Sequence, residues 1–359
     1  MTKVAVVGGG LCGLATSWHL LKLNCRVVVF DSQIHKGVPR STNGFYATAS
    51  AVAAGLLHPL TPKLKVAWAG DAAMADANSL LDDARHYGGE DLVTTNLLLR
   101  PCRDEADALK CSGAAALLGS ARLRWIEPAD FDYGGNGFGG VQIVQGKVID
   151  AARYLRALWA ACEASGDATW QNADADVSSL LADYDRVIFC GGARGLGPLL
   201  SGRRPGLRLT RGESAELRRR SSLPEQKPWA LLRGDYLAPL ADKGHFILGA
   251  TREGIDAYAE TAPDDVDTLL RGKLAGVAAS LGLNDEDFQG QASTAGVRFD
   301  GPRTPFGRLP FVHVDEDEPR LIYAGGLGAR GLLRHGQIGA LAAAVAMDGA
   351  PVPLELRLL

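Results

Sequence analysis

Apolar and polar residues recur with two different periods along the chain, and this pattern predicts where strands and helices lie. The apolar run Val4–Val7 is followed by a Gly-rich turn, which indicates a buried strand that ends sharply. Over 11–23 the apolar residues recur at helical spacing, and 26–31 returns to a strand pattern. The chain therefore opens with a strand, helix, strand unit of the kind that packs on a parallel sheet.

Similar units are predicted in the middle and at the end of the chain. Helical periodicity is found over 67–87, 150–165, 264–283 and 336–347, and strand-like runs over 186–190 and 321–324. Two blocks of another character separate these units. Residues 92–145 are strand-like and rich in turns, and 231–251 shows the alternation of antiparallel strands.

This order predicts an α/β protein with two interleaved domains. We expect a Rossmann-type nucleotide-binding domain assembled from three discontinuous segments, 1–88, 146–205 and 295–359. An α+β substrate-binding domain with an antiparallel sheet would be inserted twice, as residues 89–145 and 206–294.

A dinucleotide-binding signature lies in the first unit. Gly8, Gly10 and Gly13 form GxGxxG directly after the first strand, where glycines allow a tight turn, close approach of a pyrophosphate, and close helix packing. Asp31 ends the second strand, where a carboxylate accepts hydrogen bonds from ribose hydroxyls. The motif alone leaves NAD and FAD open, and also a tight Gly turn in some other α/β fold.

Composition and charge bear on the kind of partner that the protein binds. The formal net charge of −3 does not indicate a nucleic-acid-binding protein. Locally, seven arginines lie between Arg203 and Arg220 against Glu213 and Glu216, which predicts either a solvated loop or helix face or an anionic partner.

The cysteines and the apolar stretches bear on the compartment. The cysteines at 12, 25, 102, 111, 162 and 190 form no CxxC pair, so we expect no metal site, no disulfide framework and a reducing compartment. The apolar stretch 338–347 is too short to span a membrane, and the first strand leaves no room for a leader. We expect a cytoplasmic protein without a membrane partner.

Further segments, in order along the chain, resemble the D-amino-acid-oxidase-like family of FAD oxidoreductases. They are SAVAAGLLHP at 50–59, VIDAARYLRAL at 148–158, DRVIFCGGA at 185–193, TRGE at 210–213, YLAP at 236–239 with LGATRE at 248–253, GVR at 296–298 and GGLGARGL at 325–332. Within that family, GLLHPL and GLGARGL are similar to glycine oxidase and to the oxidase domain of a bifunctional tRNA (5-methylaminomethyl-2-thiouridine) biosynthesis protein.

The resemblance implies FAD as cofactor and a set of residues around it. It assigns to FAD, besides the first Gly-rich turn and Asp31, the residues Ser50, Gly55, Leu56, Leu57, Gly192, Gly326, Gly328, Arg330, Gly331 and Leu332. It places His58 near the flavin, where a histidine either modulates the flavin or only packs in a loop. Residues 51 and 52 are Ala and Val, and no cysteine follows Cys190, so we expect FAD to be bound non-covalently.

The resemblance also implies the substrate and its ligands. Oxidation of a C–N bond by hydride transfer to flavin would act on an amino acid or an N-substituted glycine, free or carried on tRNA. Arg298 would clamp the substrate carboxylate, Tyr236 would add a hydroxyl donor, and Arg330 would reach flavin or substrate. For Arg298 the alternative is a structural ion pair, and for Tyr236 it is packing.

One segment departs from the family pattern. After Arg298 the acid and proline of 299–307 do not fall at the usual offsets, which puts the substrate in doubt more than the fold. Two alternative functions therefore stay open. One is a flavin reductase or hydroxylase fed by NAD(P)H, with 191–197 as the candidate second phosphate motif. The other is a catalytically altered flavoprotein that acts as a binding module.

Overall fold

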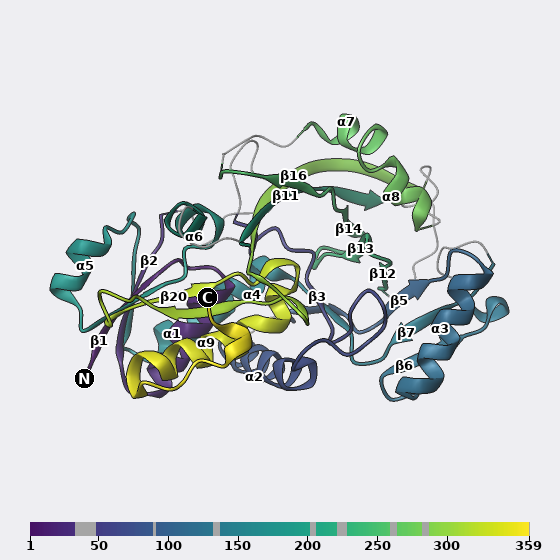
Figure 1. The fold of residues 1–359 in the computed structure, drawn as a ribbon. Helices are drawn as coiled ribbons and strands as arrows, with labels where there is room; N and C mark the ends of the chain where they lie inside the picture. The colour runs from purple at the N-terminus through teal and green to yellow at the C-terminus, as the bar shows by residue number, and fades with distance from the viewer. Residues whose placement is uncertain are drawn as a thin grey trace.

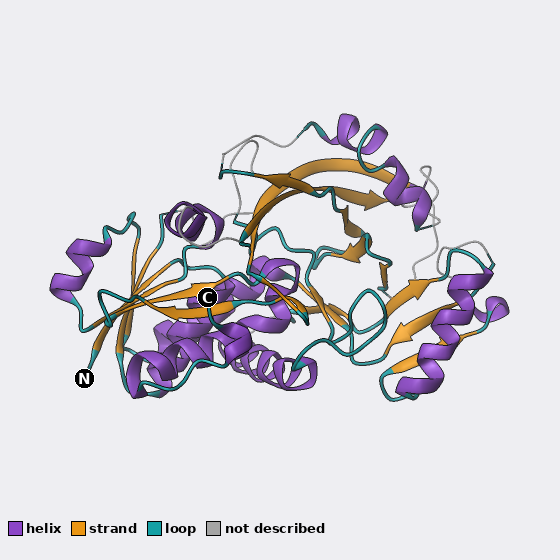
Figure 2. Ribbon diagram, in the orientation of Figure 1, coloured by secondary structure: helices purple, strands orange, loops and turns teal. Residues whose placement is uncertain are grey.

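The computed structural model describes residues 1–32, 48–88, 91–131, 137–201, 206–220, 228–258, 264–281 and 287–358. Within these ranges the chain forms a mostly parallel sheet, which is covered by helices on both faces, and beside it a long, curved and mostly antiparallel sheet (Figures 1 and 2). Both parts are built from segments far apart in the sequence, as the mixture of colours in Figure 1 shows.

The first sheet has six strands, in the order β19-β20-β10-β1-β2-β9. Every neighbouring pair is parallel except β19 with β20. The strands are β1 (Lys3–Val7), β2 (Arg26–Phe30), β9 (Ala168–Gln171), β10 (Arg186–Phe189), β19 (Phe311–Val314) and β20 (Leu321–Gly325). The order reverses between β1 and β10, which makes the carboxyl ends of these two strands the expected ligand crevice.

Side chains of β1 show why both faces of this sheet are covered. Val4 and Val6 pack in one core, and Ala5 and Val7 pack in another. The first core is closed by α1 (Leu11–Lys22), α2 (Gly70–Gly88), α4 (Ala151–Ala164) and α9 (Gly331–Asp348). The second is closed by α5 (Val177–Asp183) and α6 (Gly192–Ser201).

The second sheet has nine strands. Eight follow the order β15-β11-β14-β13-β12-β5-β7-β6, and β16 pairs with β11. The strands are β5 (Leu98–Pro101), β6 (Leu123–Ile126), β7 (Gly140–Ile143), β11 (Arg208–Arg219), β12 (Ala230–Leu232), β13 (Tyr236–Pro239), β14 (His245–Gly249), β15 (Glu253–Ile255) and β16 (Phe288–Asp300). Helices α7 (Val266–Arg271) and α8 (Ala275–Ser280) cover the outer side of its long strands, and α3 (Glu105–Leu118) lies beside β6 and β7 (Figure 1).

Short elements complete the described fold. A small sheet is formed by β3 (Leu56–Leu57), β4 (Val93–Thr95) and β8 (Lys147–Ile149), and β17 (Arg303–Thr304) pairs with β18 (Gly307–Arg308). Single 3-10 turns lie at Pro128–Asp130, Gly328–Arg330 and Leu354–Leu356. The second of these 3-10 turns leads directly into α9.

The structure confirms the α/β fold class and corrects several elements. Residues 92–145 were predicted to be strands and turns, but they contain α3, whose N-cap Asp104 accepts a hydrogen bond from the backbone N–H of Asp107 at 2.7 Å. The predicted helix 264–283 is interrupted at Gly272, and α9 begins five residues before its predicted start at Gly336. Strand β9 and helix α5 were not predicted. The domain boundaries given above stay a prediction.

The basic stretch also differs from its prediction. Its residues Arg208–Arg219 form neither a loop nor a helix but β11, which pairs with β14, β15 and β16, while the alternative of an anionic partner stays a prediction. Arg211 is buried there, 2.6 Å from a carboxylate oxygen of Glu213. Of the seven arginines, Arg203 and Arg204 lie outside the described residues.

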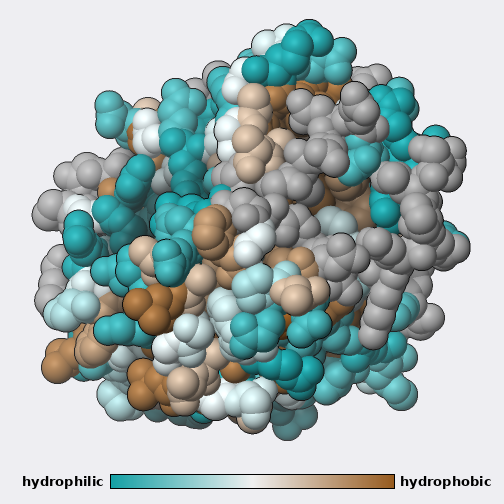
Figure 3. All heavy atoms as spheres, turned by 90° about the vertical axis from the view of Figure 1, so that its right-hand side faces the viewer, coloured by the Kyte–Doolittle hydropathy of each residue, from teal (hydrophilic) through white to brown (hydrophobic). Residues whose placement is uncertain are grey.

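None of the helices in the described part of the chain combines the length and the apolar character that a membrane span requires. On the end of the molecule that carries α3, hydrophobic residues are scattered among hydrophilic ones (Figure 3). Leu109 and Leu117 of α3 belong to the exposed apolar residues, at 75% and 86% exposure.

Candidate active site

A cavity of about 770 Å³ lies where the two main sheets meet. Its floor contains the turns that follow β1, β10 and β20, represented by Gly8, Gly191 and Gly326. Its walls include residues of β11, β13 and β16 from the second sheet. The cavity therefore occupies the crevice at the reversal of strand order, where open α/β sheets bind their ligands.

The first Gly-rich turn is shaped by backbone contacts that exclude side chains. Gly8 has a φ of +108°, and a Cβ there would lie 2.6 Å from the carbonyl oxygen of Cys190. A Cβ on Gly13 would lie 1.7 Å from the carbonyl oxygen of Gly8. Gly8 lines the cavity and Gly13 does not, so Gly13 serves the close packing of α1 on the turn.

The N-terminus of α1 faces the cavity with its backbone donors. Gly10 is the N-cap and provides no side-chain cap, and the first turn of α1 contains no acidic residue. Ser50 Oγ accepts a hydrogen bond from the backbone N–H of Leu11 at 3.2 Å, and both residues line the cavity. Backbone N–H groups and the positive end of a helix dipole at this place fit a pyrophosphate.

Asp31 takes part in shaping the turn as well as lining the cavity. Its Oδ2 atom accepts a hydrogen bond from the backbone N–H of Gly9 at 2.7 Å. The carboxylate at the end of β2 therefore holds the Gly-rich turn against the second strand. The ribose contact predicted for Asp31 stays a prediction.

The closing Gly-rich turn lies on the same cavity as the opening one. Gly326, Gly328, Arg330, Gly331 and Leu332 all line it. In the described structure, Nη1 of Arg330 is buried without a hydrogen-bond partner, and burial lowers the pKa of this guanidinium group. A buried donor with no protein partner is costly, and it points to a ligand acceptor at this turn.

Asp300 connects the closing turn to the second sheet. Its backbone forms a bridge with Leu327, and its Oδ2 atom accepts a hydrogen bond from the Thr210 hydroxyl at 3.0 Å. A Cβ on Gly328 would lie 2.3 Å from Oδ1 of Asp300. The segment that departs from the family pattern therefore begins at Asp300 with a residue that supports the closing Gly-rich turn.

His58 lines the cavity as a neutral imidazole. Its Nδ1 atom accepts a hydrogen bond from the backbone N–H of Leu60 at 3.3 Å, which leaves the proton on Nε2. Burial, and then the charge of Arg330, lower the pKa of His58 to about 4. His58 can therefore donate a hydrogen bond from Nε2 at neutral pH but carries no charge.

The predicted substrate ligands come together from two strands of the second sheet. Arg298 on β16 lies opposite Thr210, and Tyr236 on β13 places its hydroxyl 2.9 Å from Ser214 Oγ on β11. Gly249 of β14 lies between Ser214 and Tyr236 in the sheet, and a Cβ on Gly249 would be 2.6 Å from the Tyr236 hydroxyl oxygen. Arg298 and Tyr236 line the same cavity as Arg330.

Most other predicted cofactor residues also line the cavity, and Leu57 is the exception. Ser50, Gly55, Leu56 and Gly192 are lining residues. Leu57 is fully buried in the core beneath the six-stranded sheet, because successive side chains of a strand point to opposite sides. The Leu57 side chain therefore does not line this cavity, and the assignment of Leu57 to FAD stays a prediction.

Sequence reasoning missed the arginines on the side of the cavity formed by β5 and the turn between β12 and β13. Arg100, Arg103 and Arg233 line the cavity there. They belong to no motif, and they meet only because β5 and β12 are parallel neighbours in the second sheet. No sequence motif indicates these three arginines, because the pairing of β5 with β12 joins segments more than a hundred residues apart.

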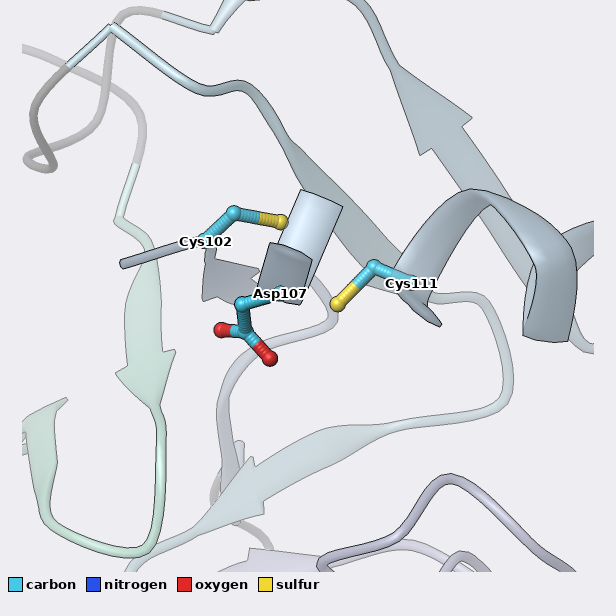
Figure 4. A group of neighbouring side chains, drawn as sticks. All are labelled: Cys102, Asp107 and Cys111. Atoms are coloured by element: carbon cyan, nitrogen blue, oxygen red, sulfur yellow. The ribbon is translucent and has the colours of Figure 1, made fainter. Parts of the chain in front are cut away.

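Behind Arg100 lies a buried group of two thiols and a carboxylate. The ligand atoms of Cys102, Asp107 and Cys111 all lie within 4.8 Å of one another, and the two sulfurs point toward the same space from opposite sides (Figure 4). Oδ1 of Asp107 accepts from Arg100 at 3.0 Å, and Oδ2 accepts from the backbone N–H of Arg103 at 3.2 Å. The carboxylate is thus committed to the arginines, so we assign the group a structural role.

Comparison with known proteins places the chain in a family. A family profile described as DAO, FAD dependent oxidoreductase, matches residues 3–345. The chain belongs to this family, which confirms the predicted resemblance, FAD as cofactor, and an oxidoreductase as the class of enzyme. A comparison with curated protein sequences gives no match.

Solved structures support the fold. Glycine oxidase from Geobacillus kaustophilus is 20% identical, with a TM-score of 0.73 over 100% of this chain and 99% of that one. Iminodiacetate oxidase from Chelativorans sp. BNC1 is 21% identical, with a TM-score of 0.71 over 98% and 97%. L-amino acid deaminase from Proteus myxofaciens is 13% identical, with a TM-score of 0.68 over 99% and 93%.

Proposed function

We propose that this enzyme oxidises the C–N bond of a small amine that carries a carboxylate, such as an amino acid or an N-substituted glycine. The observation that carries the proposal is the meeting of both Gly-rich turns with Arg298, Tyr236 and Arg330 on one cavity. The structures of glycine oxidase and iminodiacetate oxidase, both named for such amines, support it.

The chain's own residues supply binding and orientation. FAD, when bound, provides the two-electron acceptor for the hydride that leaves the substrate carbon. The residues that would hold it non-covalently are those of the two Gly-rich turns, with Asp31 and Ser50. Backbone N–H groups of 326–331 would stabilise negative charge on the flavin ring.

The substrate would be held by a guanidinium group and a hydroxyl. Arg298 would bind the carboxylate in a bidentate manner, and Tyr236 would donate to it while its partner Ser214 fixes the hydroxyl. The apolar residues Leu56 and Leu232 on the cavity wall would favour the neutral amine, the form that reacts. Arg330 and neutral His58 would contact flavin or substrate.

The alternative reductase is less well supported by the structure. It requires a second phosphate-binding turn, for which 191–197 was the candidate. Gly191 and Gly192 line the same cavity as Gly8, and α6 starts there, which supports a role of this turn in the same FAD site rather than in a second nucleotide site.

Anaerobic flavin reduction tests the proposal. Glycine, sarcosine, D-amino acids, proline and undermodified tRNA are added separately to the yellow holoenzyme, and bleaching is followed. Arg298→Ala should weaken binding of the reactive carboxylated amine by roughly thirtyfold or more, because a partner of a buried charge pair is lost, while FAD stays bound.

Arg303→Ala is the matched control, since Arg303 is exposed on β17 and does not line the cavity. Rapid bleaching by NADPH with no response to any amine would overturn the proposal in favour of a reductase. Salt-dependent tRNA binding without flavin reduction would favour a binding module.

A further inference from the structure

Arg334 on α9 carries a buried positive charge behind the closing Gly-rich turn. It lies three residues after the start of α9 at Gly331, and it is only 2% exposed. Burial, and then the charge of Arg330, lower the pKa of Arg334 to about 10, so the guanidinium group stays protonated at neutral pH. A charge removed from water is costly unless an opposite charge lies beside it.

The contacts of Arg334 lower the cost of burial without neutralising the charge. Its Nη1 atom donates a hydrogen bond to Oε1 of Gln337 at 3.3 Å, and the guanidinium carbon lies 5.5 Å from the centre of the Trp68 ring. The Phe306 ring lies beside Trp68, with 6.4 Å between the ring centres. An amide and an aromatic face attract a cation but carry no net charge. Within the described ranges, Arg330 is the one charged group that shifts the pKa of Arg334, and it is another cation.

Two acids of neighbouring elements do not offset this charge. Asp300 at the end of β16 supports the closing turn, and Asp76 of α2 packs against Gly336. Burial raises the pKa of Asp76, which disfavours its charged form. Neither carboxylate shifts the pKa of Arg330 or of Arg334.

Arg330 connects this charge to the cavity. In the described structure its Nη1 atom is buried without a hydrogen-bond partner, and Arg330 lines the cavity. The charge of Arg330 acts on Arg334 and also on His58, another lining residue. Leu332 and Leu333, which lie between the two arginines in the chain, line the cavity as well. Arg334 therefore lies about one helical turn behind the cavity wall.

The N-terminus of α9 adds to the same potential. The helix is 18 residues long, its first turn contains no acidic residue, and its N-cap Arg330 provides no side-chain cap. The positive end of the helix dipole is therefore left at the closing turn. The helix dipole, Arg330 and Arg334 act with the same sign on one end of the cavity.

We propose that Arg334 tunes the flavin, because its buried charge, acting with Arg330 through the closing turn, stabilises the negative charge that the flavin ring gains on reduction. This inference rests on the proposed place of the flavin at this turn and not on which amine is oxidised. An arginine paired with a carboxylate would lose most of its field, whereas one held by an aromatic ring and an amide retains it. Arg334 does not line the cavity, so it is a positioning residue and takes no direct part in the chemical step.

Two measurements on the holoenzyme report this charge without any amine. Sulfite adds to the flavin ring and leaves a negative charge on it, which nearby cations stabilise. Arg334→Gln should raise the dissociation constant of sulfite, followed by bleaching of the flavin, about tenfold, as expected for one unit charge acting across a partly buried site. It should also lower the midpoint potential of the bound flavin by about 30 mV, which is the same tenfold change for a two-electron couple.

Three further variants separate charge from packing. Arg334→Lys keeps the charge and should retain most of both values. Arg334→Met supplies the uncharged comparison if Arg334→Gln folds poorly, because an apolar chain of similar length suits a buried site. Arg186→Gln is the matched control and should change neither value, since Arg186 donates to the carbonyl oxygen of Ala346, near the opposite end of α9, at 2.9 Å.

The tuning role and the proposed function can fail separately. Sulfite binding and midpoint potential equal to those of the unchanged protein in Arg334→Gln would overturn the tuning role, whichever amine reduces the flavin. Shifts of the same size in Arg334→Lys would overturn it too, because shape and not charge would then matter. Shifts that Arg334→Lys largely avoids would support the tuning role even if no amine reduces the flavin, a result that would overturn only the oxidase.

Discussion

The carboxylate of Asp31 holds the backbone N–H of Gly9 at 2.7 Å and thereby fixes the turn that opens the cofactor site. An acid at the end of the second strand is expected to contact a ribose. Here it also fastens the Gly-rich turn to β2 and determines the direction in which the N-terminus of α1 points. Loss of the carboxylate should therefore weaken FAD binding even if the ribose contact is weak.

We expect Asp31→Ala to weaken FAD binding by roughly ten- to a hundredfold, because a hydrogen bond to a charged group contributes about 1.5–3 kcal/mol. Asp31→Asn retains an acceptor oxygen for Gly9 and should have the smaller effect. Equilibrium titration of the apoprotein with FAD, followed by flavin fluorescence, measures both variants. FAD affinity equal to that of the unchanged protein in Asp31→Ala would show that the turn holds its shape without this contact.

Two glycines of the same motif should respond differently to alanine. Gly13→Ala places a Cβ 1.7 Å from the Gly8 carbonyl oxygen, so the backbone must move and the fold should lose several kcal/mol of stability. A Cβ on Gly10 would meet the Ser50 hydroxyl at 2.9 Å, which is the end of a small side chain and can shift.

Gly10→Ala should therefore fold but bind FAD poorly, since its methyl group occupies the side from which the pyrophosphate approaches. Thermal unfolding of the apoproteins and FAD titration separate the two effects. Equal losses of stability in both variants would contradict this division of roles.

The sequence predicted the parts of the site that are continuous in the chain. The first Gly-rich turn and Asp31 depend on one strand, helix, strand unit whose spacing is visible without a structure. The segment 50–58 and the closing turn were assigned by resemblance, and most of their residues line the cavity. The side chain of Leu57 does not line the cavity, because the resemblance gives a segment and not the strand face of each side chain.

The parts that the sequence did not reveal depend on pairing between distant segments. Arg100 and Arg233 meet through the parallel pairing of β5 and β12, and no local pattern encodes that pairing. Helix α3 was missed because its apolar residues do not form one face, and Leu109 and Leu117 are exposed. The split of 264–283 at Gly272 was missed because its helical periodicity continues across the glycine.

The hydroxyl of Tyr236, which contacts Ser214, allows a test of whether Tyr236 binds substrate or only packs. Tyr236→Phe removes the hydroxyl that lies 2.9 Å from Ser214 Oγ and keeps the ring. We expect the KM for the carboxylated amine to rise about tenfold, the value of one hydrogen bond to a charged group, with kcat and FAD content little changed. Steady-state kinetics with Ser214→Ala as a companion variant measure this.

Ser214→Ala keeps the Tyr236 hydroxyl but loosens it, so it should raise KM by less. A Tyr236→Phe variant with unchanged KM but a lower melting temperature would assign the tyrosine to packing alone.

His335 should make stability depend on pH. It is 1% exposed, its Nε2 atom lies 2.6 Å from the Tyr154 hydroxyl, and its Nδ1 atom lies 2.8 Å from the carbonyl oxygen of Leu332. Burial lowers the pKa of His335 to about 4 from 6.5 in the unfolded chain. As the pH falls, the unfolded state therefore binds a proton before the folded state does. The contribution of the neutral His335 to the free energy of unfolding is fully present above pH 6.5 and is lost between pH 6.5 and pH 4.

At pH 5 this single group should cost the folded state roughly 1–2 kcal/mol relative to pH 7. His335→Gln should lower the free energy of unfolding at pH 7, because the buried Tyr154 hydroxyl loses its partner, and should also make the change between pH 7 and pH 5 smaller. Urea unfolding of the holoenzyme at both pH values, with saturating FAD, measures the difference. His86→Gln, at an exposed site on α2, is the control and should leave the pH dependence unchanged. If His335→Gln and the unchanged protein lose the same stability between the two pH values, the proton is taken up elsewhere and His335 is only a packed side chain.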